Sequence, residues 1–205
     1  MKHFAFLFFG CCLLLVAFKS DKDEKMFVQT QFRKADVQLK QMLKIADEKP
    51  LAFPRTIDKA GKMVATNMYD WTPGFFSGSL WYEFENTNDP AIKKAAIQWT
   101  EKLEPLKNFT QHHDLGFMMY CSYGNAYRLT GNEEYKKIII QAAKSLSTRF
   151  NPITGSIKSW NVFKSWHGDK QYTFPVIIDN LMNLELLFFA SKVTGDTSFR
   201  HIAHG

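Results

Sequence analysis

The chain has 205 residues, which fits one domain or part of a larger one and leaves little room for two. Apolar residues make up 45% and charged residues 22%, with only 11 Gly and 7 Pro, so collagen-like and disordered classes are excluded. The formal charge of +6 is spread in ones and twos between acidic residues, which is typical of a solvated surface and argues against nucleic-acid binding.

The first predicted element is a secretory signal over residues 1–20. After Lys2 and His3 comes an apolar run of 15 residues, shorter than the roughly 20 that a membrane span needs. Cys11 and Cys12 lie inside this run, whereas the lipidated Cys of a lipoprotein signal follows it. We therefore expect an exported, periplasmic bacterial protein, with a lipid-anchored outer-membrane protein as the alternative.

Removal of such a signal leaves Cys121 as the single cysteine, so no intrachain disulfide is expected. Cys121 ends the apolar run 117–121, which predicts a buried small hydrophobic residue and not a nucleophile. The chain contains no CxxC or HExxH motif, and we predict no metal site.

An amphipathic helix is predicted next, ending before Pro50, because its apolar residues recur at steps of three or four. These residues are Phe32, Ala35, Leu39, Met42, Leu43 and Ala46.

Three later segments, residues 74–100, 114–143 and 179–203, share one pattern. Each has an apolar stretch, a short turn and then an amphipathic stretch, which predicts a helical hairpin. The turns are Thr87-Asn88-Asp89, Thr130-Gly131-Asn132 and Thr194-Gly195-Asp196.

The two helices of each hairpin differ in pattern. The second has one apolar face and belongs outside, while the first is apolar nearly all round and belongs inside. Such an arrangement is an all-α toroid of helical hairpins. A straight solenoid, the alternative, would need a more even period than the 43 and 64 residues between the turns. The extra residues, 150–175, predict a long loop of the kind that is often functional.

Only about six or seven helices are predicted before the chain stops at Gly205. An open half ring would leave inner apolar surface in water. We therefore expect an incomplete toroid.

Two aspartates stand at corresponding places, Asp114 sixteen residues before Thr130 and Asp179 fifteen before Thr194. Each is at the predicted start of an inner helix, where a plain N-cap is the alternative interpretation. Inner helix starts converge at one end of a toroid, so the two carboxylates can face one cavity, one ionised and one protonated. The helix dipole favours ionisation, so the acid of the pair needs burial or a neighbouring charge to raise its pKa.

Aromatic residues make up 15% of the chain, more than a small core needs. Trp71 and Trp160 lie on segments leading into or between helices and are candidate sugar contacts. Trp166 also offers a ring face, whereas Trp81, in mid-helix, is predicted to be core. His113 precedes the first carboxylate and either serves as a polar cap or orients a substrate acid group.

Four ordered motifs make residues 27–205 resemble glycoside hydrolase family 88, the unsaturated glucuronyl hydrolases. They are Asp70-Trp71-Thr72-Pro73-Gly74-Phe75-Phe76-Ser77-Gly78, His113-Asp114-Leu115-Gly116-Phe117, Gly155-Ser156-Ile157-Lys158-Ser159-Trp160 and Ile178-Asp179-Asn180-Leu181-Met182-Asn183.

The resemblance implies an (α/α)6 barrel of twelve helices, of which residues 21–205 would be the N-terminal half or slightly more. It implies an anionic substrate, an oligosaccharide from a polysaccharide lyase that carries a 4,5-unsaturated uronic acid at its non-reducing end. The family continues beyond this point with residues that bind the substrate's acidic groups, so the chain alone is expected to be inactive.

The resemblance also implies roles for the site residues. Asp179 would protonate C4 and activate the water that adds at C5, and Asp114 would keep Asp179 protonated and stabilise the cation. The subsite for the unsaturated uronate would be lined by His113, Trp71, Trp160 and Asn180, with no metal or organic cofactor. Two alternatives stay open, an unsaturated galacturonyl or rhamnogalacturonyl hydrolase on the same fold and a non-catalytic glycan-binding remnant.

Overall fold

The computed structural model describes residues 2–49 and 52–205, with the side chains of 22–49 and 52–205. The chain divides into two compact units, residues 1–41 and 42–205. The boundary falls within α1 (Lys2–Asp47). The signal predicted at residues 1–20, with Cys11 and Cys12, lies outside the described side chains and stays a prediction. None of the helices in the described part has the length and apolar character needed to cross a membrane.

Helix α1 ends at Asp47, as the sequence predicts for a helix that stops before Pro50. Within the second unit its last turn buries Ala46 completely. The Trp99 indole donates a hydrogen bond to Asp47 Oδ1 at 3.2 Å, which ties the end of α1 to the next helices.

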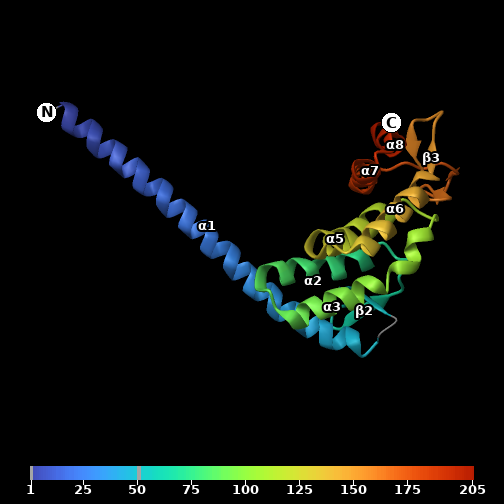
Figure 1. Cartoon of the computed structure of the whole chain (residues 1–205), viewed down its shortest axis with the longest axis horizontal. Helices are drawn as coiled ribbons and strands as arrows, with labels where there is room; N and C mark the ends of the chain where they lie inside the picture. Colours follow the sequence, from blue (N-terminus) through green and yellow to red (C-terminus); the bar gives the residue numbers. More distant parts are fainter. Residues whose placement is uncertain (1, 50–51) are drawn as a thin grey trace. The chain divides into compact units, whose positions relative to one another are not determined.

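Three helical hairpins make up most of the second unit, and the predicted repeat is confirmed (Figure 1). They are α2 (Pro73–Thr87) with α3 (Pro90–Glu101), then α4 (Leu115–Met119), η2 (Tyr120–Gly124) and α5 (Asn125–Thr130) with α6 (Glu133–Ser147), and α7 (Asn180–Thr194) with α8 (Thr197–His204). A 3-10 turn, η1 (Glu104–Asn108), follows α3.

All three hairpins turn by the same hydrogen-bonded device. In the third, Thr194 Oγ1 donates to the Ala190 carbonyl, Gly195 takes the left-handed conformation at φ 74°, and Asp196 accepts from the Ser198 N–H at 2.8 Å. A left-handed residue ends the first helix and a side-chain cap starts the second, so the turn needs few residues. The equivalent pairs in the other hairpins are Asn88 with Asp89 and Gly131 with Asn132.

The outer helices α3 and α6 pack as their amphipathic patterns predict. The buried apolar residues are Ile92, Ala95 and Trp99 in α3, with Leu103 just after it, and Tyr135, Ile139, Ala142 and Leu146 in α6. The predicted core position of Trp81 is confirmed, because its ring is fully buried and its indole donates to Thr100 Oγ1 at 2.8 Å.

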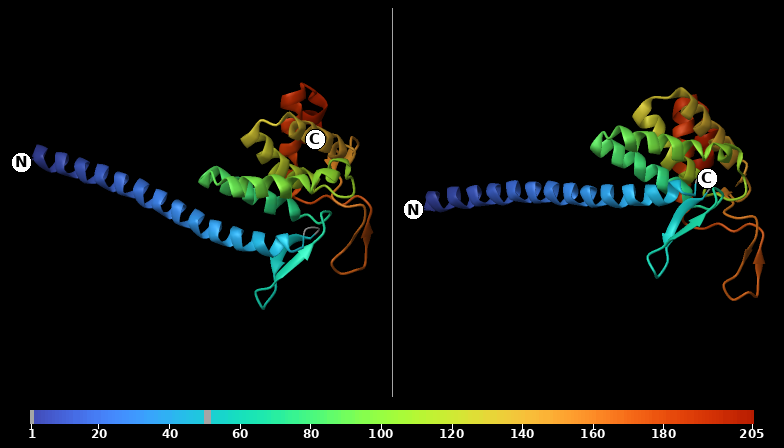
Figure 2. Two further views of the ribbon diagram at one scale, coloured as in Figure 1. Left: turned by 60° about the horizontal axis from the view of Figure 1, so that its bottom comes forward. Right: turned by 90° about the horizontal axis from the view of Figure 1, so that it is seen from below.

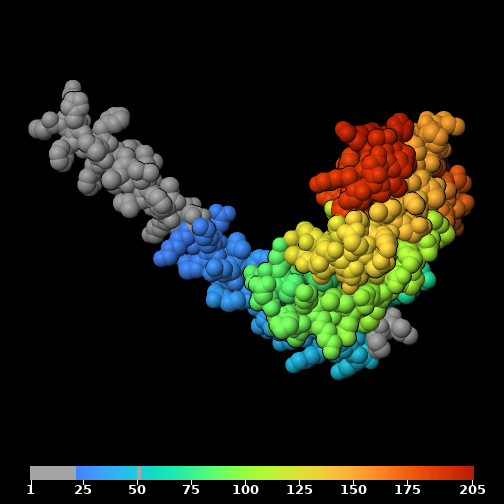
Figure 3. Space-filling model, viewed as in Figure 1, coloured from blue at the N-terminus to red at the C-terminus, as the bar shows by residue number. Residues whose placement is uncertain are grey.

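Helix α7 departs from the prediction of burial on all sides. Leu186 and Leu187 are fully buried, but Leu181 is 62% exposed and Phe188 41% exposed. Among the described residues, α7 packs against α4, α6 and α8, and these helices cover only one of its faces. Figure 3 shows the red atoms of α7 and α8 against the orange and yellow atoms of α6.

The second inner helix is not continuous, contrary to the expectation of one helix from residue 114. A π-helical turn, η2, separates α4 from α5. There Ser122 Oγ donates to the Met118 carbonyl at 2.6 Å, and such side-chain bonding disturbs the regular ladder. Cys121 lies in this turn, half-buried, and burial with the charge of Glu185 raises the pKa of its thiol to about 11. The raised pKa agrees with the predicted absence of a nucleophile, but the thiol is half-buried and not fully buried as the sequence predicts.

Short antiparallel hairpins join the helices, and they are more regular than the sparse strand signals suggest (Figure 2). The sequence did not predict the first of these hairpins, at residues 53–66. In its turn, Asp58 Oδ1 accepts hydrogen bonds from the Ala60 and Lys62 N–H groups at 2.9 Å each. Residues 150–175, predicted as a long loop, carry the other two. The pairs are β1 (Phe53–Ile57) with β2 (Met63–Thr66), β3 (Phe150–Asn151) with β4 (Ser156–Ile157), and β5 (Phe163–Lys164) with β6 (Gln171–Tyr172).

Candidate active site

The residues that precede the outer helices differ in their contacts from those that precede the inner helices α4 and α7. Asp89, Asn132 and Asp196 cap the outer helices with side-chain hydrogen bonds. Asp114 and Asp179 occupy the same position on the inner helices α4 and α7 but make no capping bond with their side chains. The capping interpretation of this pair is therefore wrong, and both carboxylates are free for other contacts.

Helices α4 and α7 interlock one turn inside the helix starts. Asn183 Oδ1 accepts a hydrogen bond from the Phe117 N–H at 2.9 Å, and Asn183 Nδ2 donates to the Asp179 carbonyl at 3.2 Å. A Cβ on Gly116 would lie 2.5 Å from Asn183 Cα, so only glycine permits this approach. The interlock holds the two aspartates side by side.

His113 lies at the centre of the site with a fully buried side chain. Its Nε2 is 3.2 Å from Asp114 Oδ1 and 3.6 Å from Asp179 Oδ1. One ligand atom from each of the three side chains falls within 4.8 Å of the others. The Asp114 side chain is 9% exposed and that of Asp179 36%, so Asp179 is the carboxylate that faces solvent.

The other ring nitrogen of His113 is held by Asn180. His113 Nδ1 lies 2.7 Å from Asn180 Oδ1, while Asn180 Nδ2 donates to the Ile157 carbonyl at 2.8 Å and contacts Ser159 Oγ at 3.3 Å. This orientation of the amide makes Nδ1 the donor to Asn180. Only a doubly protonated ring can then offer a hydrogen at Nε2 to the carboxylates. The amide of Asn180, predicted to bind substrate, is thus occupied by protein partners.

Ser159, which sequence reasoning did not single out, connects the loop to the helix starts. Its carbonyl accepts from the His113 N–H at 3.0 Å, its N–H donates to Pro175 at 2.8 Å, and its hydroxyl accepts from the Ile177 N–H at 3.1 Å. The preceding residue is held by Arg149, whose Nε donates to the Lys158 carbonyl at 2.7 Å. Only its place inside a motif pointed to Ser159.

The surroundings push the pKa values of the two carboxyl groups apart. For Asp114, burial alone would raise the pKa, but the contacts with His112 and His113 outweigh burial and lower it to about 2. For Asp179, burial raises the pKa, the charge of Asp114 adds to the rise, and His113 opposes it. The pKa of His113 itself is raised, because Asp114, Asn180 and Asp179 together outweigh its burial. One carboxylate is therefore kept ionised and the other is biased toward its protonated form.

His112 is a second histidine of the site that the predicted set omitted. Its Nδ1 lies 3.0 Å from Asp114 Oδ2, and its Nε2 lies 3.0 Å from the Tyr69 carbonyl. Both oxygens of Asp114 thus face a histidine. The adjacency of two histidines and an aspartate in the sequence was the available signal.

The two tryptophans predicted to bind sugar contact different residues at the start of α4. Trp160 has its ring centroid 5.8 Å from that of His113 and pairs in a β-bridge with His112, so it lies beside the carboxylates. Trp71 is 47% exposed, with its ring edge-on to Phe117, the third residue of α4, at 6.4 Å. It also lines an open groove of about 510 Å³ against β1.

His113, Asp114 and Asp179 are residue types that also bind metals, and among the described residues they form one compact group. The expectation that no metal is bound stays a prediction.

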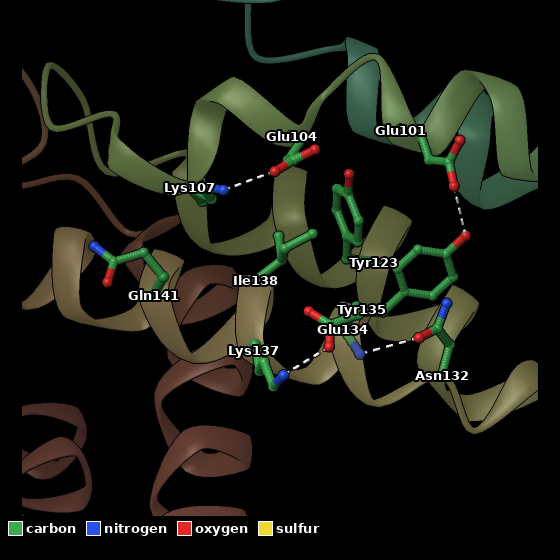
Figure 4. A pocket seen from close by; sticks show the side chains of 10 residues that line it. All are labelled: Glu101, Glu104, Lys107, Tyr123, Asn132, Glu134, Tyr135, Lys137, Ile138 and Gln141. Carbon is green, nitrogen blue, oxygen red and sulfur yellow. Dashed lines mark hydrogen bonds and ion pairs between the residues drawn. The ribbon is translucent and has the colours of Figure 1, made fainter.

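A separate groove of about 630 Å³ lies between α3, η1 and α6, with Tyr123 and Tyr135 among its lining residues (Figure 4). Its carboxylates are already paired, Glu104 with Lys107 at 2.7 Å and Glu101 with the Tyr135 hydroxyl at 3.1 Å. It shares no residue with the carboxylate site, so we place the candidate active site at Asp114 and Asp179.

Helical hairpins whose inner helices present a carboxylate pair define an α/α-barrel class of protein, and the predicted fold class is confirmed. The family model described as glycosyl hydrolase family 88 matches residues 42–204, so the chain belongs to that family.

Similar proteins agree with this assignment. The chain is 44% identical over 153 residues to the unsaturated glucuronyl hydrolase of Formosa agariphila, covering 74% of this chain and 37% of the relative. It is 32% identical over 173 residues to the unsaturated chondroitin disaccharide hydrolase of Streptococcus pyogenes serotype M1, covering 82% and 42%. The crystal structure of an unsaturated glucuronyl hydrolase specific for heparin superposes with a TM-score of 0.72 at 39% identity, covering 84% of this chain and 45% of that one. The chain thus spans about two fifths of these curated relatives.

Proposed function

We propose that the protein removes 4,5-unsaturated uronic acid from the non-reducing end of oligosaccharides by hydrating the enol ether. The observation that carries this proposal is the pair of uncapped carboxylates around His113, with the pKa of Asp114 lowered to about 2 and that of Asp179 raised. Protonation of a vinyl ether needs an un-ionised acid beside a fixed negative charge; the raised pKa of Asp179 favours the first, and the ionised Asp114 provides the second.

The proposed reaction uses Asp179 twice. Its carboxyl group donates a proton to C4, and the developing positive charge at C5 and the ring oxygen is stabilised by the ionised Asp114. The carboxylate of Asp179 then takes a proton from water as the water oxygen bonds to C5, which restores the acid. The resulting hemiketal collapses, the glycosidic bond breaks and the shortened sugar leaves. The net change is the addition of one water molecule.

The proposed substrates are products of lyases that act on glycosaminoglycan-type polysaccharides. The names of the relatives support this choice, since one is a chondroitin disaccharide hydrolase and a solved neighbour is specific for heparin. His113, Trp71 and Trp160 are proposed to contact the unsaturated sugar, while Asn180 acts through His113. The excess of basic over acidic residues, 26 to 20, suits an anionic ligand.

The test is the ultraviolet absorbance of the conjugated double bond, followed in the protein as its gene encodes it. Unsaturated chondroitin and heparin disaccharides are expected to lose this absorbance. Loss with the lyase products of pectin alone would favour an unsaturated galacturonyl or rhamnogalacturonyl hydrolase. Binding of the sugars by calorimetry with persistent absorbance would contradict the proposal and indicate a glycan-binding protein.

The pH dependence of hydration is expected to follow the protonated fraction of Asp179. Because the folded-state pKa is raised above 3.8, the acid stays protonated to a higher pH than an ordinary aspartate, and activity is lost as the pH rises through that raised pKa. Asp114 remains ionised until the pH falls to about 2. Measurement of kcat against pH at constant ionic strength checks this prediction, and a rate that climbs steadily into alkaline solution would contradict it.

We also propose that the protein is exported, on the pattern of residues 1–20 alone. Sequencing of the mature N-terminus from fractionated cells is expected to find a start beyond Phe18 in the periplasmic fraction. A mature chain that begins at Met1 in the cytoplasm would contradict export, and recovery of a lipid-modified cysteine in the membrane fraction would favour the anchored alternative.

A further inference from the structure

A row of aromatic rings leads away from the catalytic cluster. The ring of Trp160 lies beside His113, Phe163 stacks on Trp160 with centroids 5.6 Å apart at 26°, and Trp166 meets Phe163 edge-on at 5.7 Å. Trp160, Phe163 and Trp166 are called the aromatic row below. The first two are half-buried and Trp166 is 91% exposed, so the row runs from the site into solvent.

The outer end of the row is carried by a structured turn. Phe163 pairs with Tyr172 across the β5–β6 hairpin, which extends away from the helices in both views of Figure 2. The turn is closed by hydrogen bonds from the Ser165 N–H to Lys170 and from the Gly168 N–H to Ser165, both at 2.8 Å. Trp166 is therefore held in water by an ordered backbone, and a large aromatic ring in that position marks a binding surface.

The same hairpin is positively charged. Between Lys158 and Tyr172 the chain carries three lysines and a single acidic residue, Asp169. Lys164 and Lys170 are exposed, and in the described part of the chain no salt bridge joins either to an acidic side chain. Aromatic faces alternating with unpaired ammonium groups match a chain of sugar rings that bear carboxylate or sulfate groups.

We propose that the β5–β6 hairpin forms an outer subsite for the sugar residues that follow the unsaturated uronate in anionic oligosaccharides longer than a disaccharide. This inference rests on the proposed function, because it places the unsaturated sugar at the carboxylates. Phe163 and Trp166 supply the ring faces, and Lys164 and Lys170 supply charge. The hairpin thus selects for substrate length and charge.

The test compares an unsaturated sulfated tetrasaccharide with the matching disaccharide. Trp166→Ala is expected to lower the ratio of kcat/KM for tetrasaccharide over disaccharide about tenfold, equivalent to ~1.4 kcal/mol. Ile153→Ala, at a turn residue that is 93% exposed outside this hairpin, is the matched control and is expected to leave the ratio unchanged. An unchanged ratio in Trp166→Ala, or an equal fall for both sugars, would overturn the subsite.

Binding measurements separate this inference from the proposed function. Calorimetric titration of the tetrasaccharide into the Asp179→Asn protein needs no turnover. Trp166→Ala is expected to weaken that binding, and the double variant Lys164→Ala with Lys170→Ala is expected to reduce its salt dependence. If hydration fails but these effects appear, the subsite stands without the reaction. Equal binding of the tetrasaccharide with and without the Trp166 side chain would contradict the outer subsite, whether or not the protein hydrates its substrate.

Discussion

Replacement of Asp179 by Asn is expected to lower kcat by ~10³-fold, within the range that general acid–base catalysis supplies, with little change in KM. The amide keeps the shape of the side chain but cannot donate the proton to C4 or accept one from water. Since the Asp179 side chain makes no capping bond, helix α7 loses no hydrogen bond in the variant. The measurement is the loss of ultraviolet absorbance with an unsaturated disaccharide, beside a thermal unfolding curve.

The matched control is Asp196→Asn at the start of α8. Like Asp179, Asp196 directly precedes a helix, but its carboxylate caps that helix by accepting from the Ser198 N–H, and Asn can accept the same bond. This variant is expected to retain full activity. Near-normal turnover in Asp179→Asn, or an equal loss in both variants, would contradict the assignment of Asp179 as the acid.

The second large effect is expected from Gly116→Ala. The new Cβ would lie 2.5 Å from both Cα and Cβ of Asn183, so the backbones of α4 and α7 must move apart. Overpacking of this kind costs about 1–3 kcal/mol and sometimes more. Because Asp114 and Asp179 begin these two helices, we expect a lower Tm together with a loss of activity larger than the loss of folded protein explains.

Gly195→Ala provides the comparison for this variant. Gly195 has a φ of 74° but no atom within 4 Å of its missing Cβ, so alanine there brings only local strain, about 1–2 kcal/mol. It is expected to lower Tm while leaving kcat per folded molecule unchanged. Calorimetry and active-site titration on both variants measure Tm and kcat per folded molecule. A wild-type Tm with a wild-type kcat in Gly116→Ala would contradict the interlock.

Much of the fold follows from local pattern. The three turns, each a Thr followed by a left-handed residue and a cap, depend on hydrogen bonds within five residues, so the sequence alone predicts the hairpins and their ends. The number of residues between each aspartate and the following turn placed Asp114 and Asp179 at equivalent helix starts. The exposed face of α7 and the π turn at Ser122 were missed, because periodicity reports apolar character and not which neighbours cover it.

The chemistry of the site depended on contacts that no local pattern contains. Asn180 lies 67 residues from His113 in the chain, yet its amide sets which ring nitrogen donates. The interlock of Phe117 with Asn183 spans 66 residues.

The hairpin repeat could be predicted without the structure, and so could the two aspartates and the family resemblance, because each depends on short contiguous sequence motifs. The family resemblance already implied Asp179 as the acid and Asp114 as its charged partner. The tertiary structure supplied the physical reason, in the histidine contacts that lower the pKa of Asp114 to about 2, and it alone revealed that Asn180 holds the histidine. A pKa depends on burial and on charges a few ångströms away in space, and folding alone brings those groups together.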